Sequence, residues 1–196
     1  MSRISIVRHA PTAYNKNKIF MGVQDVPFDE DSSIDWGNLK AVFAEEKCQV
    51  CYTSPLSRAF NTALRIFDEN QIIVDNRLIE RDMGSWTGVL KKDIKEKYPI
   101  AFKNGVTDIY YTPEGGEHYE KLIKRVAEFL VERYEKNTRV AIVSHNGVLR
   151  AMKSLILGVT LSQAFEKPEP FLSVQSFDLH SLVIERMKKN CLYTAN

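Results

Sequence analysis

The alternation of short β-branched runs with longer amphipathic stretches is the feature that most constrains how this chain folds. The apolar runs lie at Ile4–Val7, Val50–Thr53, Ile72–Val74, Val140–Val143 and around residue 177 in VQSFDLH. Runs of this length, bordered by polar or turn residues, are typical of buried strands. Because strands that alternate with helices build parallel sheets covered by helices, the pattern favours an α/β fold: a three-layer α/β/α sandwich with a mostly parallel central sheet.

Two of the stretches between these runs have apolar residues at helical spacing. One predicted helix covers residues 57–69, and a longer one runs from Pro113 to about Glu135, with Thr112 and Pro113 expected to cap and open it. Their apolar faces consist of Ala59, Ala63, Ile66 and Phe67 in the first helix and of Leu122, Val126, Phe129 and Leu130 in the second.

The amino-acid composition limits which kinds of protein this chain can be and which partners it is expected to bind. With 196 residues, 44% of them apolar and 27% charged, the chain is long and apolar enough for one globular domain over residues 1–196. A net charge of +2 is too small to indicate nucleic acid or an anionic membrane as a partner. The N-terminal apolar run is too short for a secretory signal, so we expect a cytoplasmic protein. The oligomeric state stays open, a dimer included.

The three cysteines do not indicate a disulfide framework, because Cys48, Cys51 and Cys191 are an odd set. Cys48 and Cys51 have the spacing of a redox pair, but they lead into a predicted strand and not into a helix. We therefore expect buried thiols without a redox function.

Cationic and imidazole side chains follow three of the predicted strands. The first strand ends in Arg8 and His9, the second is followed by Arg58 one turn into a helix, and the fourth ends at His145. The carboxyl ends of parallel strands meet at one edge of a sheet, where ligands of α/β proteins bind. Two imidazoles, two guanidiniums and a helix N-terminus at that edge predict a site for a phosphate-sized anion.

Taken one at a time, these residues are also compatible with purely structural roles. A single histidine at a strand end is more often structural than catalytic, and an arginine at a helix start is usually a solvated charge. His9 and His145 with a carboxylate would also suit a metal ion. Neighbouring arginines repel a divalent cation, so we expect no metal here.

Six blocks of the chain resemble, in the same order, the motifs of one enzyme family. VRHAPTAYN resembles Arg-His-Gly-x-(Ser/Thr)-x-x-Asn, MGVQDVPF resembles Gly-x-x-Asp-x-Pro-Leu, and YTSPLSRAFNTA resembles Ser-x-Leu-x-Arg-Ala-x-x-Thr-Ala. LIERDMGSWTG resembles Leu-x-Glu-x-x-Phe-Gly-x-Trp-Glu-Gly, TPEGGEHYEKL resembles Pro-Gly-Gly-Glu-Ser, and VSHNGVLR resembles Val-Ser-His-Gly-Gly-Val-Ile-Arg. These are motifs of the histidine phosphatase superfamily, also called phosphoglycerate-mutase-like, and they extend from residue 3 to residue 150.

The resemblance implies a role for each matching residue. His9 would accept the phosphoryl group, Arg8, Arg58 and His145 would bind its oxygens, and Glu80 would protonate the leaving group. Asp82 is a competitor for this acid, but Glu80 matches the family's Leu-x-Glu position. A second group, Asn15 and Thr12, would contact the phosphate, although either side chain could instead satisfy backbone groups of its turn. The family chemistry requires no metal and no cofactor.

Several positions depart from the family pattern. Ala10 replaces a glycine, which would cost about 1 kcal/mol if the position needs a positive φ. Asn146 also replaces a glycine and tolerates left-handed backbone better. Thr87 replaces a glutamate, and His118 replaces a serine. His118 and Asn146 are weaker candidates for substrate contacts, and a surface position for His118 is the alternative.

Residues 89–112 are predicted to form part of a lid over the leaving group. This segment contains five lysines and no arginine, whereas the resemblance implies an arginine-bearing insertion in cofactor-dependent mutases. We therefore expect a phosphatase of a small phosphorylated metabolite. A mutase and a non-catalytic module that binds a phosphorylated ligand are the alternatives. The lysines are candidates for attracting an acidic substrate, or they form a solvated helix face.

Overall fold

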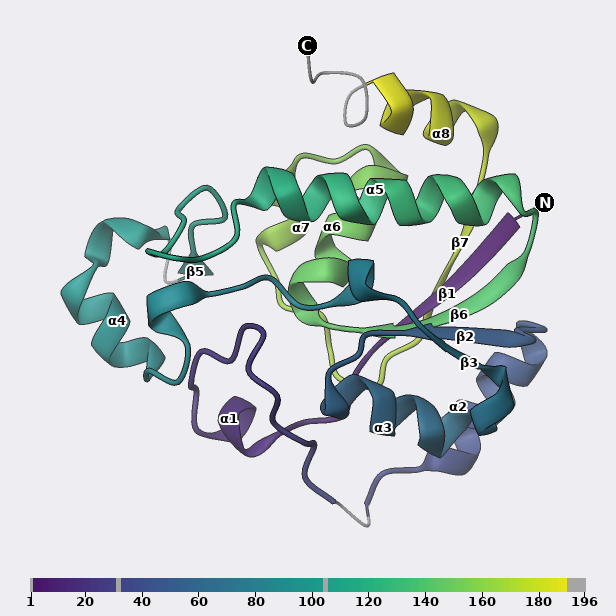
Figure 1. The fold of residues 1–196 in the computed structure, drawn as a ribbon, viewed down its shortest axis with the longest axis horizontal. Helices are drawn as coiled ribbons and strands as arrows, with labels where there is room; N and C mark the ends of the chain where they lie inside the picture. Colours follow the sequence, from purple (N-terminus) through teal and green to yellow (C-terminus); the bar gives the residue numbers. More distant parts are fainter. Residues whose placement is uncertain (1, 31–32, 104–105, 190–196) are drawn as a thin grey trace.

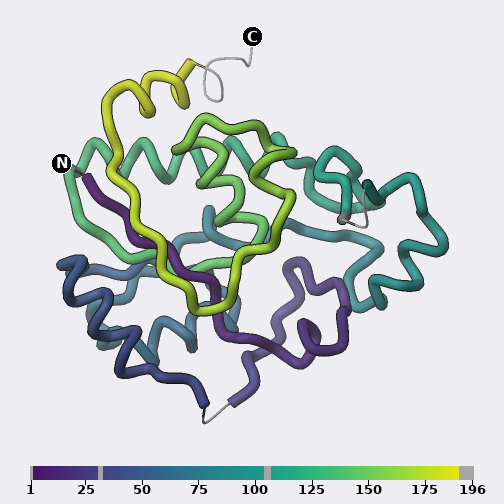
Figure 2. Tube along the Cα trace, turned by 180° about the vertical axis from the view of Figure 1, so that it is seen from behind, coloured from purple at the N-terminus to yellow at the C-terminus, as the bar shows by residue number. Residues whose placement is uncertain are grey.

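A computed structural model describes residues 2–30, 33–103 and 106–189 and places a five-stranded sheet at the centre of the molecule (Figure 1). The strand order is β3-β2-β6-β1-β7. The strands are β1 (Ser2–Arg8), β2 (Val50–Thr53), β3 (Ile72–Val74), β6 (Arg139–Ser144) and β7 (Gln175–Leu179). All neighbours pair in parallel except β7, which is antiparallel to β1. Figure 2 shows β7 beside β1 from behind.

Helices cover both faces of this sheet, which confirms the three-layer sandwich. Helices α2 (Trp36–Glu45) and α3 (Ser57–Ile66) cover one face, and α5 (Tyr119–Glu135) and α6 (Asn146–Leu157) cover the other (Figure 1). The shorter helices are α1 (Ala13–Lys16), α4 (Lys91–Lys97), α7 (Leu161–Phe165) and α8 (Ser181–Met187). No helix in the described ranges is both long and apolar enough to cross a membrane.

Two hydrophobic cores, one on each face, explain why the strands are apolar at nearly every position. Ile4 and Ile6 of β1 face α5 and α6, whereas Val7 faces α2 and α3. Strand β6 alternates in the same way, with Ile142 in the first core and Val143 in the second. Successive side chains of a strand point to opposite faces, so a strand between two helical layers has no polar face.

Parallel pairing brings the strand ends to a common edge. Arg8 of β1 lies opposite Ser144 of β6, and Thr53 of β2 lies opposite Val143. The residues that follow these strands, among them His9 and His145, therefore start from the same level of the sheet.

Both predicted helices differ from the observed ones at an end. Helix α5 begins at Tyr119, with His118 as its N-cap residue, and not at Pro113. The intervening Gly115 has a φ of 70°, a left-handed conformation that interrupts a helix. Helix α3 ends at Ile66, because Phe67 is extended and Asp68 starts a separate 3₁₀ turn, η1 (Glu69–Gln71). The prediction that Thr112 and Pro113 open α5 is therefore wrong.

The segment predicted as a lid packs around Trp86. It contains α4, the 3₁₀ turn η4 (Pro99–Ala101) and the small antiparallel pair β4 (Phe102–Lys103) and β5 (Val106–Thr107). Phe102 and Tyr111 stack on the Trp86 ring, and Tyr98 packs beside it. Trp86 lies in η3 (Gly84–Trp86), which follows the remaining 3₁₀ turn, η2 (Asn76–Leu78). Residues 89–112 thus have a small core of their own at one end of the sheet.

The thiols carry no disulfide in the described part of the chain. Cys51 is buried in β2 and Cys48 is half-buried, both as free thiols, and burial raises the pKa of the Cys51 thiol. Cys191 lies outside the described residues.

Gly84 allows the loop at Glu114–Gly116 to close against η3. Its φ is 47°, and a Cβ added there would lie 2.1 Å from the Glu114 carbonyl oxygen. We expect Gly84→Ala to lower the free energy of unfolding by about 2 kcal/mol or more, because the clash adds to the backbone strain. Urea unfolding measures this change.

Gly115→Ala is the matched control. Gly115 also has a positive φ, but no atom lies within 4 Å of its would-be Cβ. The free energy of unfolding of Gly115→Ala should fall by only about 1 kcal/mol, the cost of the backbone strain alone. Equal losses in the two variants would show that the close approach at Gly84 contributes nothing.

Candidate active site

Three segments bring their functional side chains together at the carboxyl edge of the sheet. His9 follows β1, Arg58 lies in the first turn of α3 after β2, and His145 follows β6 as the N-cap residue of α6. The His9 and His145 ring centroids are 5.1 Å apart, and the two side chains are 2% and 0% exposed. The structure therefore brings these three residues together, as the sequence predicted.

One nitrogen of His9 is fixed by the backbone. Nδ1 lies 2.7 Å from the Ala10 carbonyl oxygen, an acceptor, so Nδ1 carries the proton and Nε2 keeps its lone pair. Burial lowers the pKa of His9 well below its usual 6.5, and the nearby Arg58 and Arg8 charges lower it further. The ring is therefore neutral at pH 7, with Nε2 available as a nucleophile.

Arg8 lies against an aromatic ring and a backbone carbonyl. Its Nη1 donates to the Glu169 carbonyl oxygen at 2.8 Å, and its guanidinium carbon lies 3.7 Å from the Phe171 ring centroid. Burial lowers the pKa of Arg8 to about 10, so the side chain keeps its charge at neutral pH. The stacked guanidinium presents its remaining donors in a fixed plane.

Arg58 is held by three acceptors. Nη1 donates to the Gln24 carbonyl oxygen and Nη2 to the Gly22 carbonyl oxygen, both at 2.8 Å. Nε lies 3.3 Å from Nδ1 of His145. Burial lowers the pKa of Arg58 to about 10, so this group also stays charged.

His145 contacts Arg58 through one ring nitrogen and is itself held by Ser54 through the other. Because Arg58 Nε is a donor, His145 Nδ1 must accept, and Nε2–H then donates to Ser54 Oγ at 2.7 Å. Burial lowers the pKa of His145 well below 6.5, with Arg58 and His9 adding to the shift. A direct contact between His145 and phosphate stays a prediction, since the ring does not line the cavity described next.

A cavity of about 620 Å³ opens beside His9. The predicted residues that line it are Arg8, His9, Asn15, Arg58, Glu80 and Asn146. Thr12 is buried away from it and caps α1, where its hydroxyl bonds Asn15 Oδ1 at 3.0 Å. His118 is exposed, lies outside the cavity lining and contacts the Thr112 hydroxyl. The structure therefore gives no support for a substrate contact by His118.

Glu80 lines the cavity and is held by two backbone amides, one of them in the first turn of α6. Its Oε2 accepts from the Gly147 amide at 3.1 Å and its Oε1 from the Arg81 amide at 2.9 Å. A Cβ added at Gly147 would lie 2.5 Å from Glu80 Oε1, so a larger residue there would displace the carboxylate. Asp82 does not line the cavity and instead bonds the Gly84 amide at 2.8 Å.

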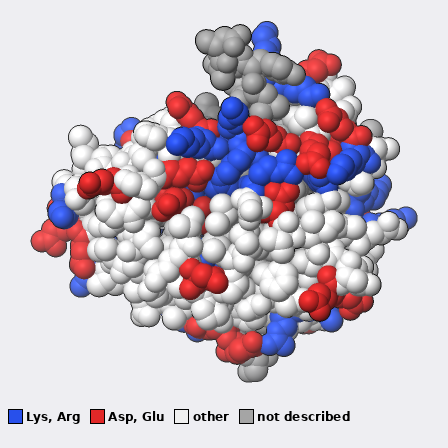
Figure 3. Space-filling view, viewed as in Figure 1, with Lys and Arg blue, Asp and Glu red and all other residues white. Residues whose placement is uncertain are grey.

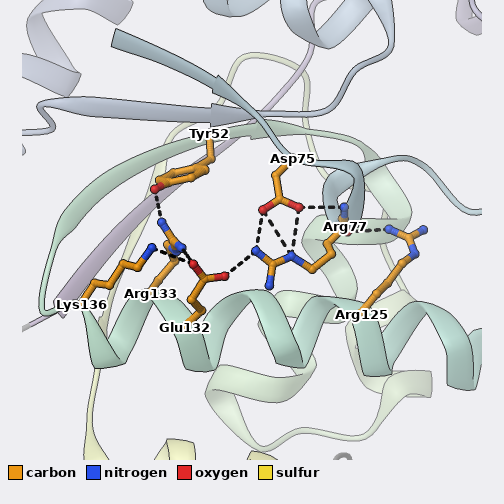
Figure 4. A network of polar contacts seen from close by, with 7 residues as sticks. All are labelled: Tyr52, Asp75, Arg77, Arg125, Glu132, Arg133 and Lys136. Atoms are coloured by element: carbon orange, nitrogen blue, oxygen red, sulfur yellow. Dashed lines mark hydrogen bonds and ion pairs between the residues drawn. The ribbon is translucent and has the colours of Figure 1, made fainter.

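A network of ion pairs anchors the segment that leads to Glu80 (Figure 4). Arg77 pairs with Asp75 and with Glu132 of α5, each at 2.6 Å. Arg125, which precedes Glu132 on α5, donates to the Arg77 carbonyl oxygen at 2.6 Å. These contacts fix residues 75–78 on α5, so Glu80 extends from a rigid support.

The two glycine replacements carry no backbone strain. Among the described non-glycine residues, positive φ occurs at Lys18, Lys47, Asn137 and Leu172, and Ala10 is not one of them. Ala10 fits because its amide donates to Thr62 Oγ1 at 3.0 Å in an ordinary conformation. Asn146 is the first residue of α6, and its Oδ1 accepts from the Glu169 amide at 2.8 Å. The condition for a cost at Ala10, a positive φ, is therefore not met, and Asn146 has no need of its tolerance for left-handed backbone.

Two further arginines line the cavity and were not predicted. Arg81 donates to the carbonyl oxygens of Ile109, Tyr111 and Glu117, at 3.3, 2.8 and 2.9 Å. Arg150 donates from Nε to the Lys167 carbonyl oxygen at 2.9 Å and from Nη2 to that of Phe165. Both lie inside matched family blocks; Arg150 matches the arginine that ends its motif, a signal that could have identified it, whereas Arg81 stands at a variable position.

Comparison with known proteins agrees with this geometry. The family model described as histidine phosphatase superfamily (branch 1) matches residues 4–188. Phosphoserine phosphatase 1 of Hydrogenobacter thermophilus is 34% identical over 168 residues, which cover 83% of this chain and 80% of that protein. A 2,3-bisphosphoglycerate-dependent phosphoglycerate mutase of Cytophaga hutchinsonii is 29% identical over 164 residues, which cover 78% of this chain and 76% of the mutase.

A similar solved structure is that of Bacillus stearothermophilus YhfR. It superposes with a TM-score of 0.81 at 25% identity and covers 92% of this chain and 93% of its own.

The protonation state of the two buried imidazoles is testable. We expect His9 and His145 to remain neutral in the folded protein as the pH falls through 6.5, because their pKa values there lie well below 6.5. In the unfolded chain, both side chains take up a proton near this pH. Their contribution to the free energy of unfolding therefore decreases as the pH falls below 6.5. NMR titration of the ring protons, assigned with His9→Gln and His145→Gln, measures both midpoints. A midpoint at or above 6.5 for either ring would contradict the proposed electrostatics.

Proposed function

Because the chain belongs to the histidine phosphatase superfamily (branch 1), we propose that it hydrolyses a small phosphomonoester through a phosphohistidine intermediate on His9. One observation carries the proposal: His9 Nδ1 is fixed by the Ala10 carbonyl oxygen, and the ring lines a cavity that Arg8 and Arg58 also line. A neutral imidazole with one nitrogen fixed is a competent nucleophile, and phosphoryl transfer requires mainly positioning and charge stabilisation.

In the first step, the lone pair of His9 Nε2 attacks phosphorus as the ester P–O bond breaks. Arg8 and Arg58 stabilise the charge on the phosphoryl oxygens. Protonated Glu80 donates its proton to the leaving oxygen, so the alcohol departs neutral. His9 then carries the phosphoryl group on Nε2 and its own proton on Nδ1.

In the second step, the Glu80 carboxylate takes a proton from a water molecule while the water oxygen attacks phosphorus. The P–N bond breaks, inorganic phosphate leaves, and the electron pair returns to His9 Nε2. Glu80 is protonated again and His9 is neutral, so the cycle closes without a metal ion.

Hydrolysis is favoured over phosphoryl transfer to a second substrate for two reasons. Residues 89–112 contain no arginine, and the phosphatase reported above shares more identity with this chain than the mutase does. O-Phosphoserine, taken from the name of that relative, is therefore a first substrate to test. A mutase would be stimulated by 2,3-bisphosphoglycerate and would move phosphate without releasing it.

The phosphohistidine is the testable core of the proposal. We expect incubation with a ³²P-labelled phosphomonoester to leave an acid-labile, base-stable label on the protein, with or without a chelator. His9→Ala should abolish label and turnover, whereas His180→Ala, which changes an exposed histidine, should retain both. Full turnover by His9→Ala, or loss of turnover with a chelator, would refute the mechanism, and tight binding without turnover would favour the binding module.

Gly147 supplies a test of Glu80 as the general acid. We expect Gly147→Ala to lower kcat about 100-fold for an alkyl phosphate, because the added methyl displaces the carboxylate. Hydrolysis of p-nitrophenyl phosphate should fall much less, since its leaving group departs as an anion and needs no proton.

Gly37→Ala is the matched control for this variant. Gly37 is the second residue of α2, as Gly147 is of α6, and its would-be Cβ meets no atom closer than 3.4 Å. An equal loss of kcat for the alkyl phosphate and for p-nitrophenyl phosphate in Gly147→Ala would show that the variant damages the site generally and not through Glu80.

A further inference from the structure

The cavity carries far more positive charge than a phosphate needs. Its lining residues include eight lysines and arginines and a single carboxylate, Glu80. A phosphomonoester brings about two negative charges at neutral pH, which Arg8 and Arg58 already match. Elsewhere the charges alternate: on the face in Figure 3, lysines and arginines are interleaved with aspartates and glutamates along α5. The excess is therefore a property of the cavity and not of the whole protein.

Helix α4 supplies positive charge to the outer part of the cavity. Three lysines of this helix, Lys91, Lys92 and Lys95, line the cavity, whereas its two acidic residues, Asp93 and Glu96, do not. A solvated helix face would mix the two signs. Helix α4 therefore turns three of its four lysines, and neither of its acidic residues, toward the ligand space.

A second segment adds to this positive wall. Lys18 also lines the cavity, and the Lys91 amide donates to the Lys18 carbonyl oxygen at 2.9 Å, so the two residues are adjacent. Lys91 Nζ lies 5.5 Å from the Phe20 ring centroid. Partial desolvation beside the cavity lowers the pKa of Lys91, and repulsion from Arg8 and Arg150 lowers it further, so the ammonium lies in a positive field.

None of these lysines has a carboxylate partner in the part of the chain that the structure describes. Lys103 in the same segment, by contrast, pairs with Asp108 at 2.7 Å, and Lys153 pairs with Glu169 at 3.0 Å. Arg150 at the cavity wall donates to two carbonyl oxygens and lies over the Phe165 ring, and it makes no ion pair with a described carboxylate. Unpaired like charges around one cavity repel one another, and an anionic ligand relieves that repulsion.

We propose that the substrate carries a second anionic group on its leaving-group side, a carboxylate or a second phosphate, bound by Lys18, Lys91 and Lys95. Arg150 contributes to the same positive wall. The proposal rests on the proposed phosphatase activity, because it assigns the part of the cavity that lies beyond the phosphoryl group. His9, Arg8 and Arg58 take the transferred phosphate, and the lysines select what it is attached to.

A matched series of three-carbon esters tests this proposal. 3-Hydroxypropyl phosphate, 3-phosphonooxypropanoate and propane-1,3-diol bisphosphate differ only in the far group, which is a hydroxyl, a carboxylate or a phosphate. We expect kcat/KM to be at least about tenfold higher for one of the anionic esters than for the alcohol. The better of the two anionic esters identifies the second group. Added salt should reduce this ratio, because it screens the lysines.

Variants of α4 assign the effect to the lysines. In Lys91→Gln/Lys95→Gln, the ratio of kcat/KM for the anionic ester to that for the alcohol should fall about tenfold. Lys97→Gln is the matched control, because Lys97 lies on the same helix but outside the cavity lining, over the Tyr98 ring. It should leave the ratio unchanged.

Equal kcat/KM for all three esters in the wild-type protein would overturn this proposal alone, with the phosphatase activity intact. So would a double variant that loses activity on all three esters in equal proportion. Failure of the wild-type protein to hydrolyse any of them, without label on His9, would overturn the proposed function and this proposal with it.

Discussion

The site depends on keeping two imidazoles neutral among buried guanidinium groups. His9 and His145 lie side by side, and the Arg8 and Arg58 charges penalise a proton on either ring. The carbonyl oxygen of Ala10 fixes the proton of His9 on Nδ1, and Arg58 requires that Nδ1 of His145 accept. A nucleophile and a positive potential thus coexist in one small volume, an arrangement that favours an anionic substrate.

The arginines of the cavity keep their charge available because carbonyl oxygens hold them. Arg8, Arg58, Arg81 and Arg150 donate to backbone carbonyls, whereas Arg3, Arg77 and Arg125 pair with carboxylates elsewhere in the fold. A carbonyl dipole fixes a guanidinium without cancelling its charge. Arg77 and Arg125 have another role and brace the segment before Glu80 on α5 (Figure 4). Among these seven arginines, the four that line the cavity make no ion pair with a described carboxylate, and the three elsewhere each make at least one.

The sequence predicted the parts of the protein that follow from periodicity and from topology. Strand positions and the meeting of His9, Arg58 and His145 are consequences of β-branched runs and of parallel pairing. The start of α5 was missed because it depends on the left-handed turn at Gly115, and the fit of Ala10 because it depends on the local φ. The partner of an arginine is set by long-range packing, so Arg81 could not be distinguished from a surface arginine, whereas Arg150 could have been found from the motif that it ends.

Chemistry and substrate choice reside on separate structural supports. The groups proposed to react extend from the sheet edge and from the braced segment before Glu80, whereas Lys91, Lys92 and Lys95 of the positive wall lie on α4, which packs on a small core around Trp86. Because Lys91, Lys92 and Lys95 are solvent-accessible and make no ion pairs with described residues, changing them costs little folding free energy. Substitutions on this face of α4 can therefore alter which leaving group is accepted while the geometry around His9 is preserved.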